Sequence, residues 1–187
     1  MVNRVVGGTI PPELGSISTL VHLELFGNQM TGTIPVELGQ LSNLEQLDLN
    51  QNKLSGTIPT QLEELDNLER LWLWKNSLTG TIPTQLAGMD KLRVLHLGDN
   101  DLSGTIPSEL GEFDDLVTLF LQNNDLSGTI PTQLGELDSL VFLDLSGNVK
   151  ITGSIPAQIC ALNLNRLWAD CDVCNADAST NCCTQCF

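Results

Sequence analysis

Leucine alternates with polar residues in a short pattern that recurs along most of the chain. Six runs follow L-x-x-L-x-L-x-x-N, and their closing asparagines are 24 residues apart. The runs cover residues 20–28, 44–52, 68–76, 92–100, 116–124 and 140–148. Alternate leucines such as Leu47 and Leu49 predict a short strand with one buried face. A fixed period of this length predicts a solenoid in which successive strands form one parallel sheet.

The second half of each repeat predicts a bend followed by a helical turn. It reads L-[ST]-G-[TS]-I-P and continues with leucines at every third position, such as Leu62, Leu65 and Leu68. Glycine permits the bend, proline ends strand pairing, and a spacing of three suits a short helical or 3₁₀ segment. The predicted fold is an α/β repeat solenoid with a parallel concave β-sheet and short convex helical or 3₁₀ segments.

The asparagine that closes each strand is predicted to be structural. It stands where the chain turns inward, so its amide can pair with backbone groups that an apolar residue would leave without partners. The predicted interior ladder is Asn28, Asn52, Asn76, Asn100, Asn124 and Asn148.

The repeat resembles the plant-type leucine-rich repeat, LxxLxLxxNxLSGxIPxxLxxLxx, from about residue 5 to residue 169. The resemblance implies a curved or twisted solenoid and a second small sheet built from the S-G-x-I-P segments. It also implies a concave face that binds a protein, peptide or glycan. The family includes receptor ectodomains and secreted inhibitors similar to polygalacturonase-inhibiting proteins. Because one fold hosts many activities, the positions that vary between coils must carry any specificity.

Two parts of the chain differ in composition. Residues 1–170 are predicted to form the solenoid, with about seven coils, and residues 171–187 a cysteine-rich C-terminal cap. The first coil is incomplete, because Arg4 stands where an asparagine is expected. We therefore expect a fragment or an incomplete gene model. The resemblance implies a location outside the cell or on its surface, with a signal peptide that is absent from this chain. No apolar run approaches the ~18 residues of a membrane span.

The cysteines gather at the end of the repeats. They are Cys160, Cys171, Cys174, Cys182, Cys183 and Cys186. An even number in this position predicts a disulfide-tied cap of a secreted or surface protein. The alternative is a zinc site, although the eight residues between the two C-x₂-C pairs are fewer than usual. We favour disulfides and predict neither metal nor cofactor. The tail is also similar to the endings of diatom leucine-rich repeat proteins.

The formal net charge of −15 limits the partners that the chain can bind. Most acidic residues fall on predicted convex positions and edges, where a solvated, repulsive surface is the simplest interpretation. A strongly acidic chain repels phosphates, so nucleic acid is disfavoured as a partner.

Aromatic residues are concentrated on the predicted concave face. Six of the eight occupy outward strand positions: Phe26, Trp72, Trp74, Phe120, Phe142 and Trp168. Trp72, His96 and Phe120 occupy equivalent positions and should stand side by side at ~4.8 Å steps. Gly98 should leave a gap beside Trp74 that a ligand group could enter. Passive packing on the sheet is the simpler alternative.

Exposed tryptophan beside arginine and lysine is typical of interaction hot spots. We therefore predict a ligand-binding patch formed by Arg70, Trp72, Trp74, Lys75, Arg93, His96, Phe120 and Phe142. An unperturbed His96 would make binding sensitive to pH near about 6.5.

Catalysis has little support in the sequence. His22 and His96 lie three coils apart, and Asp48 and Asp144 are separated by ~19 Å, too far for a glycosidase pair. We therefore expect a binding protein and no enzyme. A different hypothesis is a structural or surface-adsorbing protein whose hydroxyl ladder contacts ice, a mineral or a polysaccharide. That ladder would be Thr9, Thr33, Thr57, Thr81, Thr105, Thr129 and Ser154.

Overall fold

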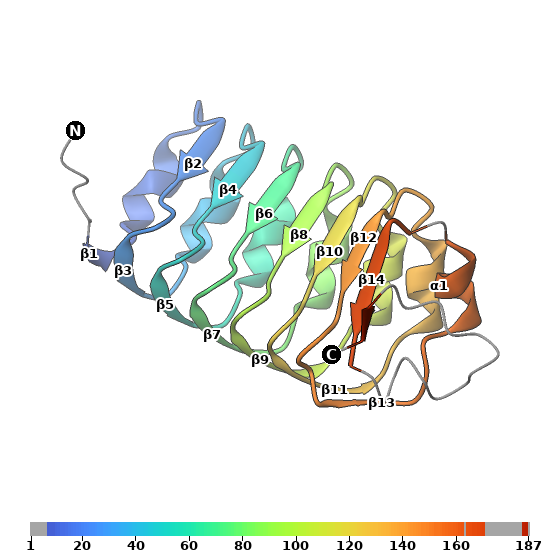
Figure 1. Ribbon diagram of the computed structural model, residues 1–187. Helices are drawn as coiled ribbons and strands as arrows, with labels where there is room; N and C mark the ends of the chain where they lie inside the picture. The colour runs from blue at the N-terminus through green and yellow to red at the C-terminus, as the bar shows by residue number, and fades with distance from the viewer. Residues whose placement is uncertain (1–6, 163, 171–184, 187) are drawn as a thin grey trace.

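The chain forms one elongated solenoid (Figure 1). The structure is a computed structural model that describes residues 7–162, 164–170 and 185–186, the last two without their side chains. Strands line one long face of the solenoid, and short helices line the opposite face. The predicted repeat solenoid is confirmed. In the described part of the chain, no helix is long and apolar enough to cross a membrane.

The larger sheet contains eight parallel strands in the order β15-β14-β12-β10-β8-β6-β4-β2. Its strands are β2 (His22–Glu24), β4 (Gln46–Asp48), β6 (Arg70–Trp72), β8 (Val94–His96), β10 (Thr118–Phe120), β12 (Phe142–Asp144), β14 (Arg166–Ala169) and β15 (Gln185–Cys186). Consecutive strands pair with a shift of one repeat, for example Leu71 with Leu95. The outward surface of this sheet is called the concave face below.

A second parallel sheet runs along the lower edge of the solenoid in Figure 1. Its strands are β1 (Gly7–Thr9), β3 (Gln29–Gly32), β5 (Lys53–Gly56), β7 (Ser77–Gly80), β9 (Asp101–Thr105), β11 (Asp125–Thr129) and β13 (Lys150–Thr152). Each strand from β3 onward follows a closing asparagine, and all seven end at or near a glycine with positive φ, such as Gly80 at 79°. The expected second sheet is confirmed.

The convex side consists of single helical turns. Six are 3₁₀ helices: η1 (Pro12–Ser16), η2 (Val36–Gln40), η3 (Thr60–Glu64), η4 (Thr84–Gly88), η5 (Ser108–Glu112) and η6 (Thr132–Glu136). The last is the α-helix α1 (Ala157–Ala161). A proline stands immediately before each of η2 to η6 and α1, and its lack of a backbone N–H explains why strand pairing stops there.

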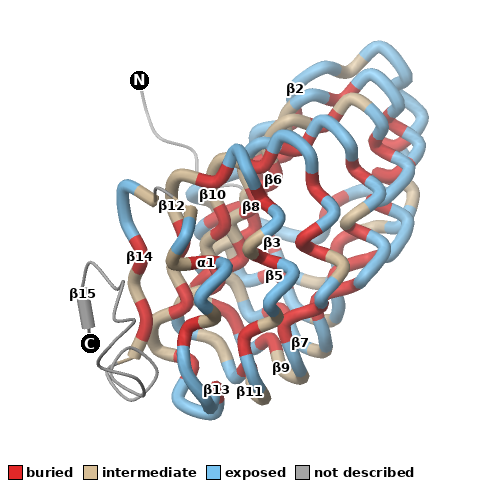
Figure 2. Tube along the Cα trace, turned by 90° about the vertical axis from the view of Figure 1, so that its right-hand side faces the viewer, coloured by how far each residue is buried: buried red, intermediate tan, exposed pale blue. Residues whose placement is uncertain are grey.

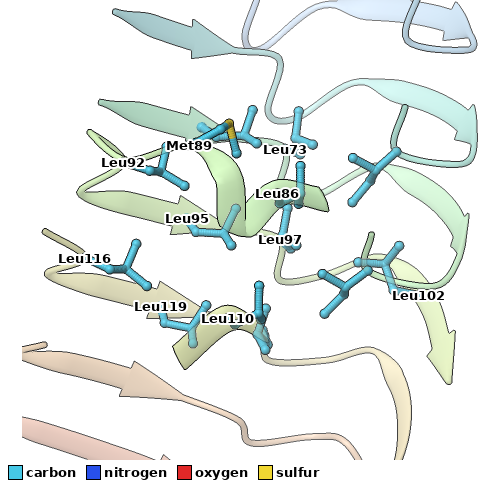
Figure 3. Packing of buried hydrophobic residues seen from close by; sticks show 14 of the residues in the cluster. Leu73, Leu86, Met89, Leu92, Leu95, Leu97, Leu102, Leu110, Leu116 and Leu119 are labelled. Atoms are coloured by element: carbon cyan, nitrogen blue, oxygen red, sulfur yellow. The ribbon is translucent and has the colours of Figure 1, made fainter. Parts of the chain in front are cut away.

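A continuous leucine core fills the space between strands and helices. Leu95 and Leu97 point inward from the strand side, and Leu86 meets them from η4 (Figure 3). Figure 2 shows the same arrangement along the solenoid, with buried residues inside each coil and exposed residues on the outer bends. Each coil buries its leucines against the coils on either side, so the core is shared among neighbours.

The closing asparagines join neighbouring coils by hydrogen bonds. Nδ2 of Asn76 donates to the carbonyl oxygens of Leu49 and Leu73, at 3.0 Å each. Its Oδ1 accepts from the backbone N–H of Leu54 at 3.0 Å. Asn52, Asn100, Asn124 and Asn148 repeat this pattern. One side chain thus satisfies backbone groups in two coils at the inward turn.

The C-terminal segment is described only in part. Cys160, on α1, is disulfide-bonded, and β15 pairs in parallel with β14. The side chains of Cys171, Cys174, Cys182, Cys183 and Cys186 lie outside the described residues, as does most of the predicted cap.

Candidate functional site on the concave face

One column of the concave face carries the aromatic centre. Strand pairing aligns Asp48, Trp72, His96, Phe120, Asp144 and Trp168 in consecutive strands. Trp72, His96 and Phe120 therefore stand side by side, as the repeat spacing predicts. Side chains at these positions point away from the leucine core because neighbouring residues in a strand alternate between faces.

Four rings from two neighbouring columns touch in a continuous row, called the aromatic strip below. Trp74 stacks on His96 with ring centroids 5.2 Å apart and an angle of 13° between the planes. Phe120 meets His96 at 5.0 Å and 80°, and it meets Trp168 at 6.2 Å and 66°. Trp168 was not included in the predicted patch, although its place in the same column as His96 was the available signal. Phe120 and Trp168 meet although the coil of Asp144 lies between theirs.

Cations flank the aromatic strip at both ends. Nζ of Lys75 lies 5.0 Å from the ring centroid of Trp74, and Cζ of Arg166 lies 5.5 Å from that of Trp168. Both distances suit cation–π attraction. Of the three bases predicted for the patch, Lys75 alone contacts a tryptophan of the strip among the described residues, and Arg166 is an addition to the predicted set.

The gap predicted beside Trp74 at Gly98 does not exist, because another side chain fills it. A Cβ atom placed on Gly98 would lie 2.4 Å from Cδ of Gln122. Nε2 of Gln122 lies 3.1 Å from Nε2 of His96, while its Oε1 is buried without a hydrogen-bond partner among the described residues. The prediction overlooked that a long side chain in the next coil reaches over a glycine.

The prediction of a pH response near 6.5 at His96 was also wrong. Burial between Trp74 and Phe120 disfavours the imidazolium and lowers the pKa of His96 to about 4, although nearby Asp99 raises it slightly. His96 is therefore neutral at pH 7 and can accept a hydrogen bond from the amide of Gln122.

The remaining predicted residues surround the strip without joining it. Trp72 is half-buried and makes no ring contact in the described part of the structure. Arg93 is exposed, Phe142 lies two positions before Asp144, and Arg70 reaches Glu69 at 3.8 Å. Arg70, Arg93 and Phe142 widen the concave surface on the side where the strands begin, and Trp72 continues the column of His96 toward Asp48.

Two carboxyl groups stand beside the aromatic residues. Burial raises the pKa of Asp48 and of Asp144, in each case against hydrogen bonds that lower it. Asp144 accepts from the backbone N–H and the hydroxyl of Ser146, at 3.0 and 2.6 Å. Asp99 and Asp170 raise its pKa further by repulsion. Within the described residues, no group of three His, Cys, Asp or Glu could hold a metal ion.

A second surface lies where the seven-stranded sheet meets the 3₁₀ helices. It is called the threonine face and consists of two columns of exposed hydroxyl residues. The first is Thr9, Thr33, Thr57, Thr81, Thr105 and Thr129, and the second is Thr60, Thr84, Ser108 and Thr132. Four hollows of about 330 to 530 Å³ follow one another along it. They are open grooves between coils and lie away from the aromatic strip.

Comparison with known proteins identifies relatives of the repeat. The leucine rich repeat family matches residues 19–41, 42–102 and 66–126. The ectodomain of the plant membrane receptor kinase GASSHO1/SCHENGEN3 from Arabidopsis thaliana, in complex with CASPARIAN STRIP INTEGRITY FACTOR 2, superposes with a TM-score of 0.84 and 40% identity. The Arabidopsis receptor kinase HAESA, solved with the peptide hormone IDA and the co-receptor SERK1, gives 0.85 and 36%. A plant ice-binding protein gives 0.68 and 30%.

The matches cover most of this chain but only part of its relatives. They span 88% of it for GASSHO1/SCHENGEN3, 91% for HAESA and 88% for the ice-binding protein. The corresponding shares of those proteins are 20%, 29% and 59%. No curated protein sequence matches the chain.

Proposed function

Because the chain belongs to the plant-type leucine-rich repeat family, we propose that it is an extracellular or cell-surface recognition module whose concave face binds a peptide or a segment of another protein. The observation that carries this proposal is the aromatic strip, a row of four rings from four coils on an exposed sheet. Receptor ectodomains with the same fold are solved with a peptide hormone or a co-receptor bound, which supports a ligand of that class.

The composition of the concave face differs from that of a passive surface. Tryptophans and arginines are enriched in the residues that dominate binding energy at protein interfaces. Here Trp74 and Trp168 each contact a cation, on a chain whose net charge is −15.

The orientation of the rings favours a peptide over a glycan. Sugars bind proteins by laying their C–H groups on an open aromatic face. In the strip, Trp74 is stacked on His96 at 13°, and the other neighbouring rings meet edge to face. The rings thus contact each other, Lys75 and Arg166, which leaves less open ring face than isolated tryptophans would offer. Apolar side chains of an extended peptide suit such a surface.

Selection of peptides on the intact chain tests the proposal. A displayed library of random peptides is selected on the immobilised protein, and the recovered peptides are measured against Trp74→Ala/Phe120→Ala. We expect this pair to weaken binding by roughly 30-fold or more, since a hot-spot residue contributes about 2 kcal/mol or more. Melting curves of the variant check that the fold is intact.

The control changes the other surface. Thr81→Val/Thr105→Val should leave peptide affinity unchanged, because these residues lie on the threonine face. Peptides that bind both variants as well as the original chain, or a selection that recovers none, would refute concave-face recognition.

A second candidate function is adsorption to a regular surface such as ice, a mineral or a polysaccharide. The specific observations are the exposed threonine columns and the likeness to a plant ice-binding protein. This function would use the repeat itself and would not require the aromatic strip.

A further inference from the structure

A hydroxyl residue stands on each side of the bend glycine in the threonine-face coils, and the two residues differ in their hydrogen bonds. The serine or threonine just before each bend glycine donates to a glycine carbonyl oxygen of the preceding coil. Thr79, for example, donates to Gly56 and Ser127 to Gly104, at 3.4 and 3.1 Å. In contrast, the hydroxyls of Thr9, Thr33, Thr57, Thr81, Thr105 and Thr129 make no hydrogen bond within the described part of the chain. The second set is therefore available to an external partner.

The unpaired threonines are nevertheless held in one orientation. A Cβ atom on Gly32, Gly56, Gly80 or Gly104 would lie 2.9 Å from Cγ2 of the threonine in the preceding coil. The same distance is 3.1 Å at Gly128, and the Cβ atoms of these five threonines lie at 3.7 to 3.9 Å. At Gly153 the methyl of Thr129 is 3.5 Å away, an ordinary contact. Each of the five closer methyl groups thus occupies the space that a side chain on the next glycine would need. Because the methyl position fixes χ1, successive hydroxyls must point the same way.

This packing creates a pre-ordered array. Neighbouring hydroxyls should repeat at the ~4.8 Å separation of parallel strands. Beneath them Ile34, Ile58, Ile82, Ile106 and Ile130 are buried and form a uniform floor. The ordering lowers the entropy that the side chains lose when they meet a partner. An array with a fixed repeat suits a partner that itself repeats.

The residues around the threonine array limit the chemical class of partner that it can bind. Segments 57–61, 81–85 and 129–133 contain no charged residue, although the chain carries 23 acids and 8 bases. Glu37 and Glu109 are the carboxylates beside the hollows described above. The hollows are lined mostly by threonine, isoleucine and proline, without any aromatic residue. A polysaccharide site would be expected to offer aromatic planes, and a mineral site charged groups.

We propose that the threonine face binds the surface of ice, through hydroxyls that are ordered by the packing of each threonine methyl against the glycine of the next coil. The inference rests on the second candidate function and is independent of peptide binding on the concave face. The hollows between coils are large enough for several water molecules each, which could extend the hydroxyl array as ordered rows.

Inhibition of ice recrystallisation by the full chain tests the proposal. The wild-type chain should slow the growth of ice grains relative to serum albumin at the same concentration. Thr81→Lys/Thr105→Lys places two charges in the centre of the face and should require a concentration roughly tenfold higher or more for the same inhibition. Thr81→Val/Thr105→Val removes the hydroxyls but keeps the methyls, and Thr81→Ser/Thr105→Ser does the reverse. Both pairs should weaken inhibition.

Two controls separate this inference from its alternatives. Thr79→Val removes an exposed hydroxyl that is already paired internally, and Trp72→Ala/Trp74→Ala alters only the concave face, so both should retain full inhibition. Circular dichroism melts confirm folding of every variant. Inhibition no better than albumin overturns the proposal, and so does full activity of the valine pair. Pelleting with cellulose or silica that depends on Thr81 and Thr105, without any effect on ice, would assign the face to another surface.

Discussion

The concave face and the threonine face are built from the same 24-residue unit, yet they differ in what repeats. On the concave face one column changes residue at almost every coil, from Asp48 through Trp72 and His96 to Phe120. On the threonine face six consecutive coils carry threonine at the same position. The first surface can distinguish a particular sequence of side chains, whereas the second can distinguish only a period.

The two faces also obtain order from different contacts. Rings of the aromatic strip hold one another, since Trp74 stacks on His96 and Phe120 meets both His96 and Trp168. Threonines of the other face are held by glycine backbone in the adjacent coil. Substitutions should therefore disturb one face without the other, unless they act on the interior that both share.

The largest expected effect comes from filling the space of a threonine methyl. Gly104→Val places a branched side chain at a φ of 81° and against Cγ2 of Thr81. Left-handed strain and overpacking together should lower the free energy of unfolding by about 3 kcal/mol or more. Chemical denaturation measures this loss.

The matched control is a glycine without such a contact. Gly27 also has a positive φ, 66°, but a Cβ atom on it would meet nothing within 4 Å, so Gly27→Val should cost only the backbone strain, about 1 to 2 kcal/mol. Equal losses in the two variants would show that the methyl packing is not what holds the threonine face.

The regular parts of this molecule were predictable because they depend on period alone. Leucine spacing predicted the strands of the larger sheet as far as β14, but it did not predict β15, which lies in the segment expected to be a cap. The L-[ST]-G-[TS]-I-P segments together with the family resemblance predicted the second sheet and the 3₁₀ turns. The sequence predicted only one of the two roles of Thr81. The sequence shows a hydroxyl column, but the lock between its methyl and Gly104 depends on packing between coils.

The concave site was less predictable because long side chains cross columns. Alignment of Trp72, His96 and Phe120 followed from register, but the stacking partner of His96 is Trp74, one column away. Gln122 fills the space at Gly98 from the next coil and crosses to the neighbouring column to meet His96. Rotamers decide such contacts, and a strand pattern does not specify them.

An interior substitution should damage both faces together. Asn100→Ala removes Nδ2 hydrogen bonds to the carbonyls of Leu73 and Leu97 and the acceptor for the N–H of Leu78. Asn100 is 8% exposed, so these backbone groups would lack partners, and we expect a loss of about 2 to 3 kcal/mol in a denaturant melt. Asn165→Ala, at an exposed position, should cost less than about 0.5 kcal/mol. An unchanged melt for Asn100→Ala would refute the structural role of the ladder.

Acidification should change the free energy of unfolding in two opposite directions, through His96 and through Asp144. The pKa of His96 is lowered to about 4, so between about 6.5 and 4 the unfolded chain takes up a proton that the folded chain does not. Stability from His96 is therefore lost as pH falls through this window, by about 1 to 2 kcal/mol after allowance for partial exposure. His96→Phe should remove that loss, as measured by urea melts at pH 7 and pH 4.5.

Asp144 supplies the opposing term. Burial raises its pKa in the folded state above 3.8, so acid stabilises the folded chain at this residue as pH falls through the raised pKa. Asp144→Asn should therefore make the chain lose more stability on acidification than the wild type does. If His96→Phe and Asp144→Asn shifted the pH dependence in the same direction, one of these two assignments would be wrong.

The smallest expected change in stability is at Lys75, where a variant can separate ligand recognition from stability. Lys75 is exposed, and its ammonium group lies 5.0 Å from the ring centroid of Trp74. An exposed cation–π contact contributes about 0.5 kcal/mol, so Lys75→Gln should lower the melting temperature by only ~1 to 2 °C. Lys53→Gln, on β5, removes the same charge away from the strip and should lower the melting temperature less.

Peptides selected on the chain should nevertheless lose more affinity with Lys75→Gln than with Lys53→Gln, because only Lys75 borders the rings that would contact them. If the two variants weakened peptide binding equally, Lys75 would contribute only through the net charge of the chain, and its contact with Trp74 would have no part in recognition.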